Sequence, residues 1–160
     1  GIRMLPASCY MDEHIPGVGV LTRRAPDERE TRDIAFGHQV ACDICGMDIG
    51  QTLLVKDGMV LAVEAFEGTD RAIRRGGKLG GRGAVVVKVA KNGHDMRFDI
   101  PVIGAKTIPV LRRAGVSALA YQAGRLVLLD RSAVIAAADR MNIAIIGLDS
   151  GLPPAPLRPV

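Results

Sequence analysis

The chain has 160 residues, of which 48% are hydrophobic and 3% aromatic, with no Trp, and its formal net charge is +4. This length suits one hydrophobic core, and the shortage of aromatic rings argues against the proteins that bind single-stranded nucleic acid by stacking bases on them. No apolar run approaches the roughly 20 residues of a membrane-spanning helix, and the first residues lack the apolar stretch of a signal peptide, so we expect a soluble, cytoplasmic domain.

The first predicted elements are a connector, a helix and a hairpin. Residues 1–26 contain three prolines and three glycines without sustained periodicity, which is typical of an extended connector. A helix is expected over 27–45, with acids in its first turn, where the helix dipole favours them. Its apolar positions keep helical spacing: Ile34, Val40, Ala41 and Ile44. Val- and Leu-rich runs at 51–56 and 59–65, joined by Asp57-Gly58, predict a hairpin with a tight turn.

A basic helix, a glycine-rich loop and a buried strand are expected next. Thr69-Asp70 offers an N-cap for a short helix that ends near Lys78. The glycines that follow predict a mobile loop without regular structure: Gly76, Gly77, Gly80, Gly81 and Gly83. The Val-rich run 84–90 predicts a buried central strand, although Lys88 is unusual within it, and Lys91-Asn92-Gly93 predicts a turn.

The remaining elements complete an α/β pattern. A helix capped by Thr107 is expected to reach residue 114, strands at 117–121 and 125–129 flank Ala123-Gly124, and a helix capped by Asp130 precedes a last strand at 143–147. The Pro-rich tail, 151–160, has no predicted structure. The fold class is therefore α/β, a mixed β-sheet with hairpins packed by three or four short helices, with one domain over 27–150.

Two carboxylates, Asp95 and Asp99, lie within the short segment that ends at Pro101. Two acids so close repel each other unless a cation lies between them. Mg²⁺ is the natural candidate, because it takes oxygen ligands, usually one or two carboxylates with phosphate and water. The alternative is an exposed loop in which one carboxylate pairs with Arg97 and the other caps a turn. Spacing alone leaves both interpretations open.

Basic residues concentrate around these acids. Between positions 71 and 97 there are eight basic residues and one acid, Asp95. Lys88 and Lys91 bracket the end of the predicted buried strand, and ligand sites in open α/β sheets favour the carboxyl ends of strands. The alternative for Lys88 is a structural pair with a buried acid such as Glu64 on the neighbouring hairpin. Thr69-Asp70, at the start of a helix, is a further candidate for binding phosphate.

Cys42 and Cys45 form a CxxC pair, and His38 lies four residues before Cys42. A redox pair normally sits at the start of a helix, where the dipole lowers the thiol pKa, whereas these residues fall near a helix end. A zinc site would need a fourth ligand, and the sequence has no second pair. We interpret these cysteines as buried small side chains.

Two longer segments carry a family resemblance. DIGQTLLVKDGMVLAVEAFEGTD, at 48–70, and VVVKVAKNGHDMRFDIPVIGAKTI, at 85–108, resemble the C-terminal domain of the UDP-2,3-diacylglucosamine diphosphatases of lipid A biosynthesis, the LpxI family of Gram-negative bacteria. The similarity runs from about Gly19 to Gly147. It implies Mg²⁺-dependent hydrolysis of a UDP-linked diacylated glucosamine, in which water attacks the α-phosphorus and releases UMP and the acylated sugar 1-phosphate.

The resemblance also implies roles for individual residues. Asp99 is the first candidate for the essential acid and Asp95 the second, as metal ligand, as activator of water, or as both. The residues expected to hold phosphate are Lys88, Lys91, Arg97, Thr69 and Asp70.

Family members carry a further N-terminal domain, so residues 1–26 are expected to be the connector from it and the isolated chain is expected to need it for activity. The expected location is cytoplasmic, at the inner-membrane surface. Exposed hairpin edges suggest a homodimer. The alternative function is a non-catalytic domain that binds phosphate or anionic lipid, or that dimerises.

Overall fold

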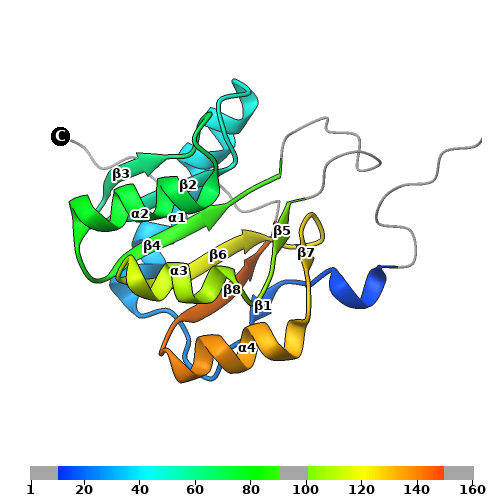
Figure 1. Ribbon diagram of the computed structural model, residues 1–160. Coiled ribbons are helices and arrows are strands. Elements are labelled where there is room, and N and C mark those ends of the chain that lie inside the picture. Colours follow the sequence, from blue (N-terminus) through cyan, green and yellow to red (C-terminus); the bar gives the residue numbers. More distant parts are fainter. Residues whose placement is uncertain (1–10, 91–100, 150–160) are drawn as a thin grey trace, which may run out of the picture.

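The computed structural model describes residues 11–90 and 101–149, which form a three-layer α/β/α arrangement around a mixed six-stranded sheet (Figure 1). The order of strands in the sheet is β1-β8-β6-β4-β2-β3, and β5 and β7 form a separate two-stranded sheet. The strands are β1 Gly19–Val20, β2 Thr52–Lys56, β3 Met59–Val63, β4 Ala84–Lys88, β5 Val102–Ile103, β6 Val116–Gln122, β7 Val127–Leu128 and β8 Ala144–Leu148. The helices are the 3-10 helix η1 Asp12–His14 and the α-helices α1 Glu28–Gly46, α2 Thr69–Gly80, α3 Thr107–Arg113 and α4 Arg131–Arg140. The predicted fold class is confirmed.

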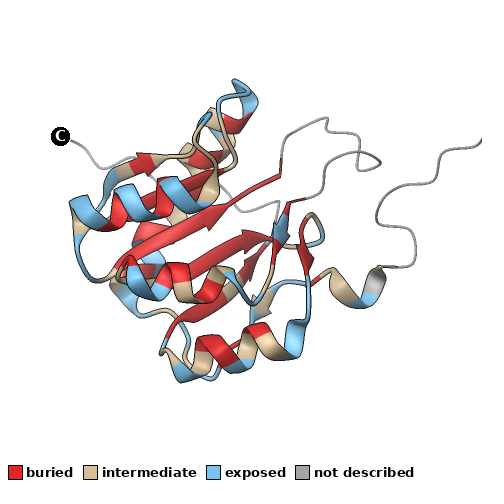
Figure 2. Ribbon diagram, viewed as in Figure 1, coloured by how far each residue is buried: buried red, intermediate tan, exposed pale blue. Residues whose placement is uncertain are grey.

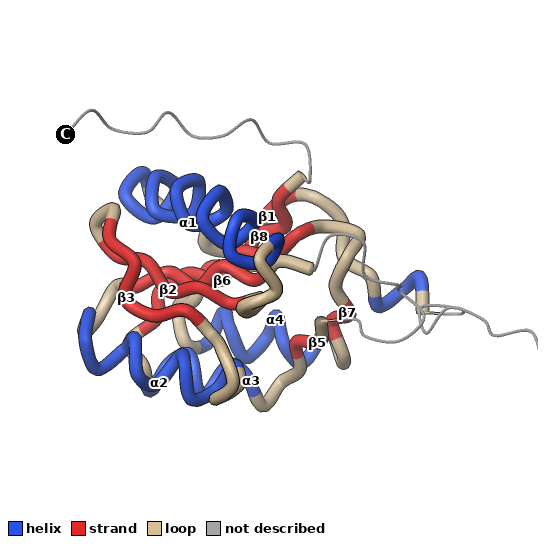
Figure 3. Tube along the Cα trace, turned by 90° about the horizontal axis from the view of Figure 1, so that it is seen from above, coloured by secondary structure: helices blue, strands red, loops and turns tan. Residues whose placement is uncertain are grey.

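The central strands β4, β6 and β8 are parallel, whereas β2 joins β4 antiparallel and β1 joins β8 antiparallel. Helix α1 covers one face of the sheet, and α2, α3 and α4 cover the other (Figure 3). Because both faces are covered, β4 reads as a continuous apolar run and is buried along its whole length, as Figure 2 shows. Val85 and Val87 pack in the core on the α1 side, and Val86 packs in the core on the other side.

The predicted first helix is confirmed, and its start is built from a reciprocal cap. The Asp27 carboxylate accepts from the Glu30 N–H at 2.7 Å, and the Glu30 carboxylate accepts from the Asp27 N–H at 2.8 Å. Glu30 also pairs with Arg24 at 2.7 Å. These contacts fix the entry of the chain into α1.

The predicted hairpin is also confirmed, with Asp57 and Gly58 at φ values of 51° and 75° in its turn. The carboxylate of Asp33, on α1, accepts from the Asp57 and Gly58 N–H groups at 3.0 and 2.7 Å. The turn is thereby fastened to the helix that covers it.

The predicted glycine loop is wrong for Gly76, Gly77 and Gly80, because α2 continues through them, whereas Gly81 and Gly83 lie between α2 and β4 as expected. Gly76 faces Leu54, which would lie 2.7 Å from an added Cβ, and a Cβ on Gly77 would strike the backbone of Ala114. These glycines let α2 approach the sheet and α3 closely, and that packing outweighs their poor helix propensity. The helix begins after Gly68, at φ 83°, so Thr69 is its first residue and not its cap.

The N-cap of α3 is Lys106 and not the expected Thr107. The expected cap of α4, Asp130, is confirmed, although its side chain makes no capping hydrogen bond. The strands expected on either side of Ala123-Gly124 belong to different sheets. Within the expected connector, Gly19–Val20 forms the edge strand β1, whereas the domain boundaries themselves stay predictions. No helix among residues 11–90 and 101–149 is long and apolar enough to cross a membrane.

The close approach of α2 to α3 predicts that Gly77→Ala lowers the free energy of unfolding by about 1–3 kcal/mol, because the new methyl group meets backbone that cannot move aside easily. Gly46→Ala is the matched control, since Gly46 also lies in a helix but has open space around it. This control should leave stability unchanged or raise it by up to about 1 kcal/mol. Urea denaturation measures both variants, and an equal effect of the two would contradict the packing argument.

Candidate functional site

A row of polar side chains crosses the sheet at the carboxyl ends of its parallel strands. Lys88, at the end of β4, lies opposite Thr52 on one side and Tyr121 on the other, and Tyr121 lies opposite Gly147. Thr52, Lys88 and Tyr121 are 2%, 8% and 0% exposed. The carboxyl edge of an open α/β sheet is where ligands usually bind, so this row is the candidate functional site.

Lys88 is held by two hydroxyl groups. Its Nζ donates to Thr52 Oγ1 and to Thr69 Oγ1, both at 3.2 Å. Thr69 in turn donates to Glu64 Oε1 at 2.6 Å. This arrangement is consistent with both interpretations of Lys88, the structural pair with Glu64 and the phosphate site. Glu64 is connected to the lysine through the Thr69 hydroxyl, and the lysine lies at the edge where phosphate is expected to bind.

The structure brings Thr69 and Lys88 together, but it places Asp70 differently. Asp70 is exposed on the first turn of α2, with its carboxylate 3.9 Å from Arg74. We call Lys88, Thr52, Thr69 and Glu64 the Lys88 cluster. Only the backbone of Asp70, at the start of α2, adjoins this cluster.

Lys91, Asp95, Arg97 and Asp99 lie outside the described residues, and their roles stay predictions. The two ends of their segment are described. Ala90 donates its N–H to Gln122 Oε1 at 3.1 Å, and the Pro101 carbonyl accepts from Val127 at 2.9 Å. The segment 91–100 therefore begins at the carboxyl end of β4, next to Lys88.

Sequence reasoning missed Thr52, Tyr121 and Gln122. Thr52 begins β2, and Tyr121 and Gln122 are the last two residues of β6. The Tyr121 hydroxyl donates to the Gly17 carbonyl at 2.9 Å, and burial raises the pKa of Tyr121 to about 12. Their polar character was visible in the sequence, but only the strand register shows that Thr52 and Tyr121 share one row with Lys88. Gln122 lies one residue further along β6, where it accepts from Ala90.

The CxxC pair lies in the last turns of α1, away from this row. Cys42 Sγ is 3.7 Å from His38 Nε2. Burial lowers the pKa of His38 and raises the pKa of the Cys42 thiol, so both side chains are neutral near pH 7. In the part of the chain that the structure describes, no group of three or more His, Cys, Asp or Glu side chains could hold a metal ion. Cys45 is buried and Cys42 is half-buried, so the expectation of buried small side chains holds fully for Cys45 alone.

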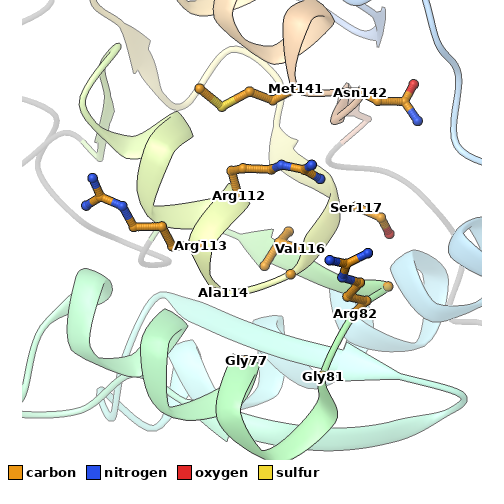
Figure 4. A pocket seen from close by; sticks show the side chains of 12 residues that line it. Gly77, Gly81, Arg82, Arg112, Arg113, Ala114, Val116, Ser117, Met141 and Asn142 are labelled. Atoms are coloured by element: carbon orange, nitrogen blue, oxygen red, sulfur yellow. The ribbon is translucent and has the colours of Figure 1, made fainter.

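A cleft of about 410 Å³ opens at the opposite end of the sheet, where β4 and β6 begin (Figure 4). Arg82 and Arg112 extend to one side of it, near Ser117, and Arg113 extends the other way. Helices α2, α3 and α4 all end at this cleft, and each helix end carries about half a negative charge. We attribute the arginines to compensation of these dipoles.

The carboxyl edge, where α1 ends on the other face of the sheet, has the opposite electrostatics on this face, because α2, α3 and α4 begin there. Their first N–H groups and positive dipole ends favour an anion. Together with the buried ammonium group of Lys88, they make this edge the better candidate for an anion site, and phosphate binding there stays a prediction.

Comparison with known proteins gives two matches. A family model described as the LpxI C-terminal domain matches residues 17–146. The UDP-2,3-diacylglucosamine pyrophosphatase LpxI of Caulobacter vibrioides is 40% identical over 139 residues, which cover 82% of this chain and 50% of that protein. The chain therefore spans about half the length of the curated relative it matches, and the matched range contains the whole Lys88 cluster.

The position of Thr69 between Glu64 and Lys88 predicts that Thr69→Val lowers the free energy of unfolding by about 1–3 kcal/mol, because two buried polar groups lose their shared partner. Thr69→Ser keeps the hydroxyl and should retain most of the stability. Urea denaturation compares the two variants, and equal losses would show that the methyl group matters and the hydroxyl does not.

Proposed function

Because the chain belongs to the LpxI family, we propose that it is the C-terminal domain of a hydrolase that cleaves the diphosphate of UDP-2,3-diacylglucosamine. Water adds to the α-phosphorus, the bond from that phosphorus to the bridging oxygen breaks, and UMP and 2,3-diacylglucosamine 1-phosphate leave. The observation that carries the proposal is the buried Lys88 at the carboxyl edge, where the segment with Asp95 and Asp99 begins.

The described residues would provide the groups that bind phosphate. Lys88 would pair with a phosphate oxygen, and the backbone N–H groups of Thr69 and Asp70 at the start of α2 would donate to it. The Asp70 carboxylate, paired with Arg74, would stay outside this contact. Lys91 and Arg97 would offset the charge that develops on the phosphate in the transition state.

A divalent metal, Mg²⁺, is part of the proposal. Carboxylates together with phosphate oxygens are the donors that Mg²⁺ prefers, so Asp95 and Asp99 would be its ligands. When bound, Mg²⁺ would neutralise phosphate charge and lower the pKa of a coordinated water. Of the two acids, Asp99 is our first choice for the residue essential to turnover.

The setting of the reaction follows from its substrate. A nucleotide-linked diacylated sugar presents its acyl chains from a membrane, so we propose a cytoplasmic location at the inner-membrane surface. Strand β3 forms one edge of the main sheet, and its exposed Met59 and Val60 suit pairing with a second copy. A homodimer is therefore part of the proposal, as is the contribution of a further domain to substrate binding.

Asp99→Ala, introduced into the protein that carries this chain, should reduce turnover at least about 100-fold, because the water and the phosphate lose the group that positions them. Release of UMP from UDP-2,3-diacylglucosamine in the presence of Mg²⁺ measures the effect, and removal of Mg²⁺ with EDTA should abolish release by the wild type.

The matched control is Asp43→Ala, which removes an exposed carboxylate from α1. Full activity is expected for this control, with thermal unfolding unchanged in both variants. Undiminished turnover by Asp99→Ala would refute the assignment. Absence of hydrolysis by the wild type would favour a non-catalytic phosphate-binding or dimerisation domain.

A further inference from the structure

Glu64 occupies a position that the backbone fixes closely. It follows β3 directly, and its N–H donates to the Thr52 carbonyl at 2.8 Å. A Cβ on Gly50 would overlap the Glu64 carbonyl, so the loop before β2 lies directly against this residue. The backbone position of Glu64, from which its side chain extends toward Thr69 and Lys88, is therefore fixed.

The hydrogen bonds between Glu64, Thr69 and Lys88 have a direction. A hydroxyl group has one proton to donate and two lone pairs that accept. The Thr69 hydroxyl donates its proton to Glu64 Oε1, at 2.6 Å. Its lone pairs therefore accept from the Lys88 ammonium group, at 3.2 Å. Without an acceptor at Glu64, the hydroxyl could rotate and direct its proton elsewhere, and Lys88 would lose a fixed acceptor.

The second carboxylate oxygen of Glu64 is not used by the fold. Oε2 is buried and has no hydrogen-bond partner within the described part of the chain. Leaving a buried acceptor unsatisfied costs about 1–3 kcal/mol, so such a group in a folded protein calls for an explanation. A carboxylate kept only for stability would be expected to use both oxygens.

We propose that Glu64 is a positioning residue of the phosphate site, which acts through Thr69 to hold the ammonium group of Lys88 toward a bound phosphate. This inference rests on the proposed function, because that function assigns phosphate binding to Lys88. The competing interpretation is that Glu64 only offsets the charge of a buried lysine, in which case its loss affects stability and leaves ligand affinity unchanged.

The test is a double-mutant cycle on UMP binding, measured by isothermal titration calorimetry with Mg²⁺ present. Glu64→Ala and Thr69→Val should each weaken UMP binding about tenfold, and the double variant should be no weaker than either single variant, because both break the same connection. Glu64→Gln keeps an oxygen that accepts from Thr69, so it should bind within about threefold of wild type.

Glu67→Ala is the matched control, since Glu67 lies on the same loop but pairs with Arg75 on the surface. It should change UMP affinity less than twofold. Independent, multiplying losses in the double variant would overturn the inference, as would a loss in Glu64→Gln equal to that in Glu64→Ala.

In this design, the role of Glu64 and the proposed function are tested separately, because UMP binding and hydrolysis are measured independently. If the wild type releases UMP from its substrate and Glu64→Ala binds UMP as tightly as wild type, the inference falls and the proposed function stands. If the wild type binds UMP but does not hydrolyse the substrate, the proposed function falls, and the cycle still decides the role of Glu64. A wild type that neither binds UMP nor hydrolyses the substrate would overturn both.

Discussion

The constraint on which this structure depends is a lysine in the central strand of a sheet that is covered on both faces. Removing an ammonium group from water is costly unless polar groups replace the water. Among the described residues, Thr52 of β2 and Thr69 in the first turn of α2 help Lys88 to meet this requirement, because β4 ends beside both. Lys88 therefore connects the pairing of β2 with β4, the course of the loop after β3 and the start of α2.

On one face of the sheet, the directions of three helices give an electrostatic polarity, which α1 on the other face does not share because it runs the opposite way. Since α2, α3 and α4 run antiparallel to the central strands, their positive ends gather at the carboxyl edge and their negative ends at the amino edge. Arg82, Arg112 and Arg113 line the cleft at the negative ends, whereas a lysine and hydroxyl groups occupy the positive ends. The cleft with these three arginines is thus the weaker candidate for an anion site, because its charges already face opposite partial charges.

Local signals in the sequence were sufficient for the elements that depend on local chemistry. Asp27 and Glu30 cap α1, Asp57-Gly58 turns the hairpin, and an unbroken apolar run makes β4. Glycine-rich α2 was predicted as a loop because the advantage of its glycines lies in contacts with Leu54 and Ala114, which are far away in sequence. At the site, Lys88 and Thr69 stood out by residue type, but their contact depends on Gly68 and on strand register, which no local pattern encodes.

The antiparallel hairpin β2–β3 is part of the site and not an addition at the edge of a parallel sheet. A purely parallel neighbour of β4 would bring its own carboxyl end to this edge, followed by a crossover that leads the chain away. The antiparallel β2 instead begins here with Thr52, and β3 returns to the same edge with Glu64. Five residues later the chain starts α2 at Thr69, so one hairpin and one helix start provide both hydroxyl groups that accept from Lys88 and the carboxylate behind one of them.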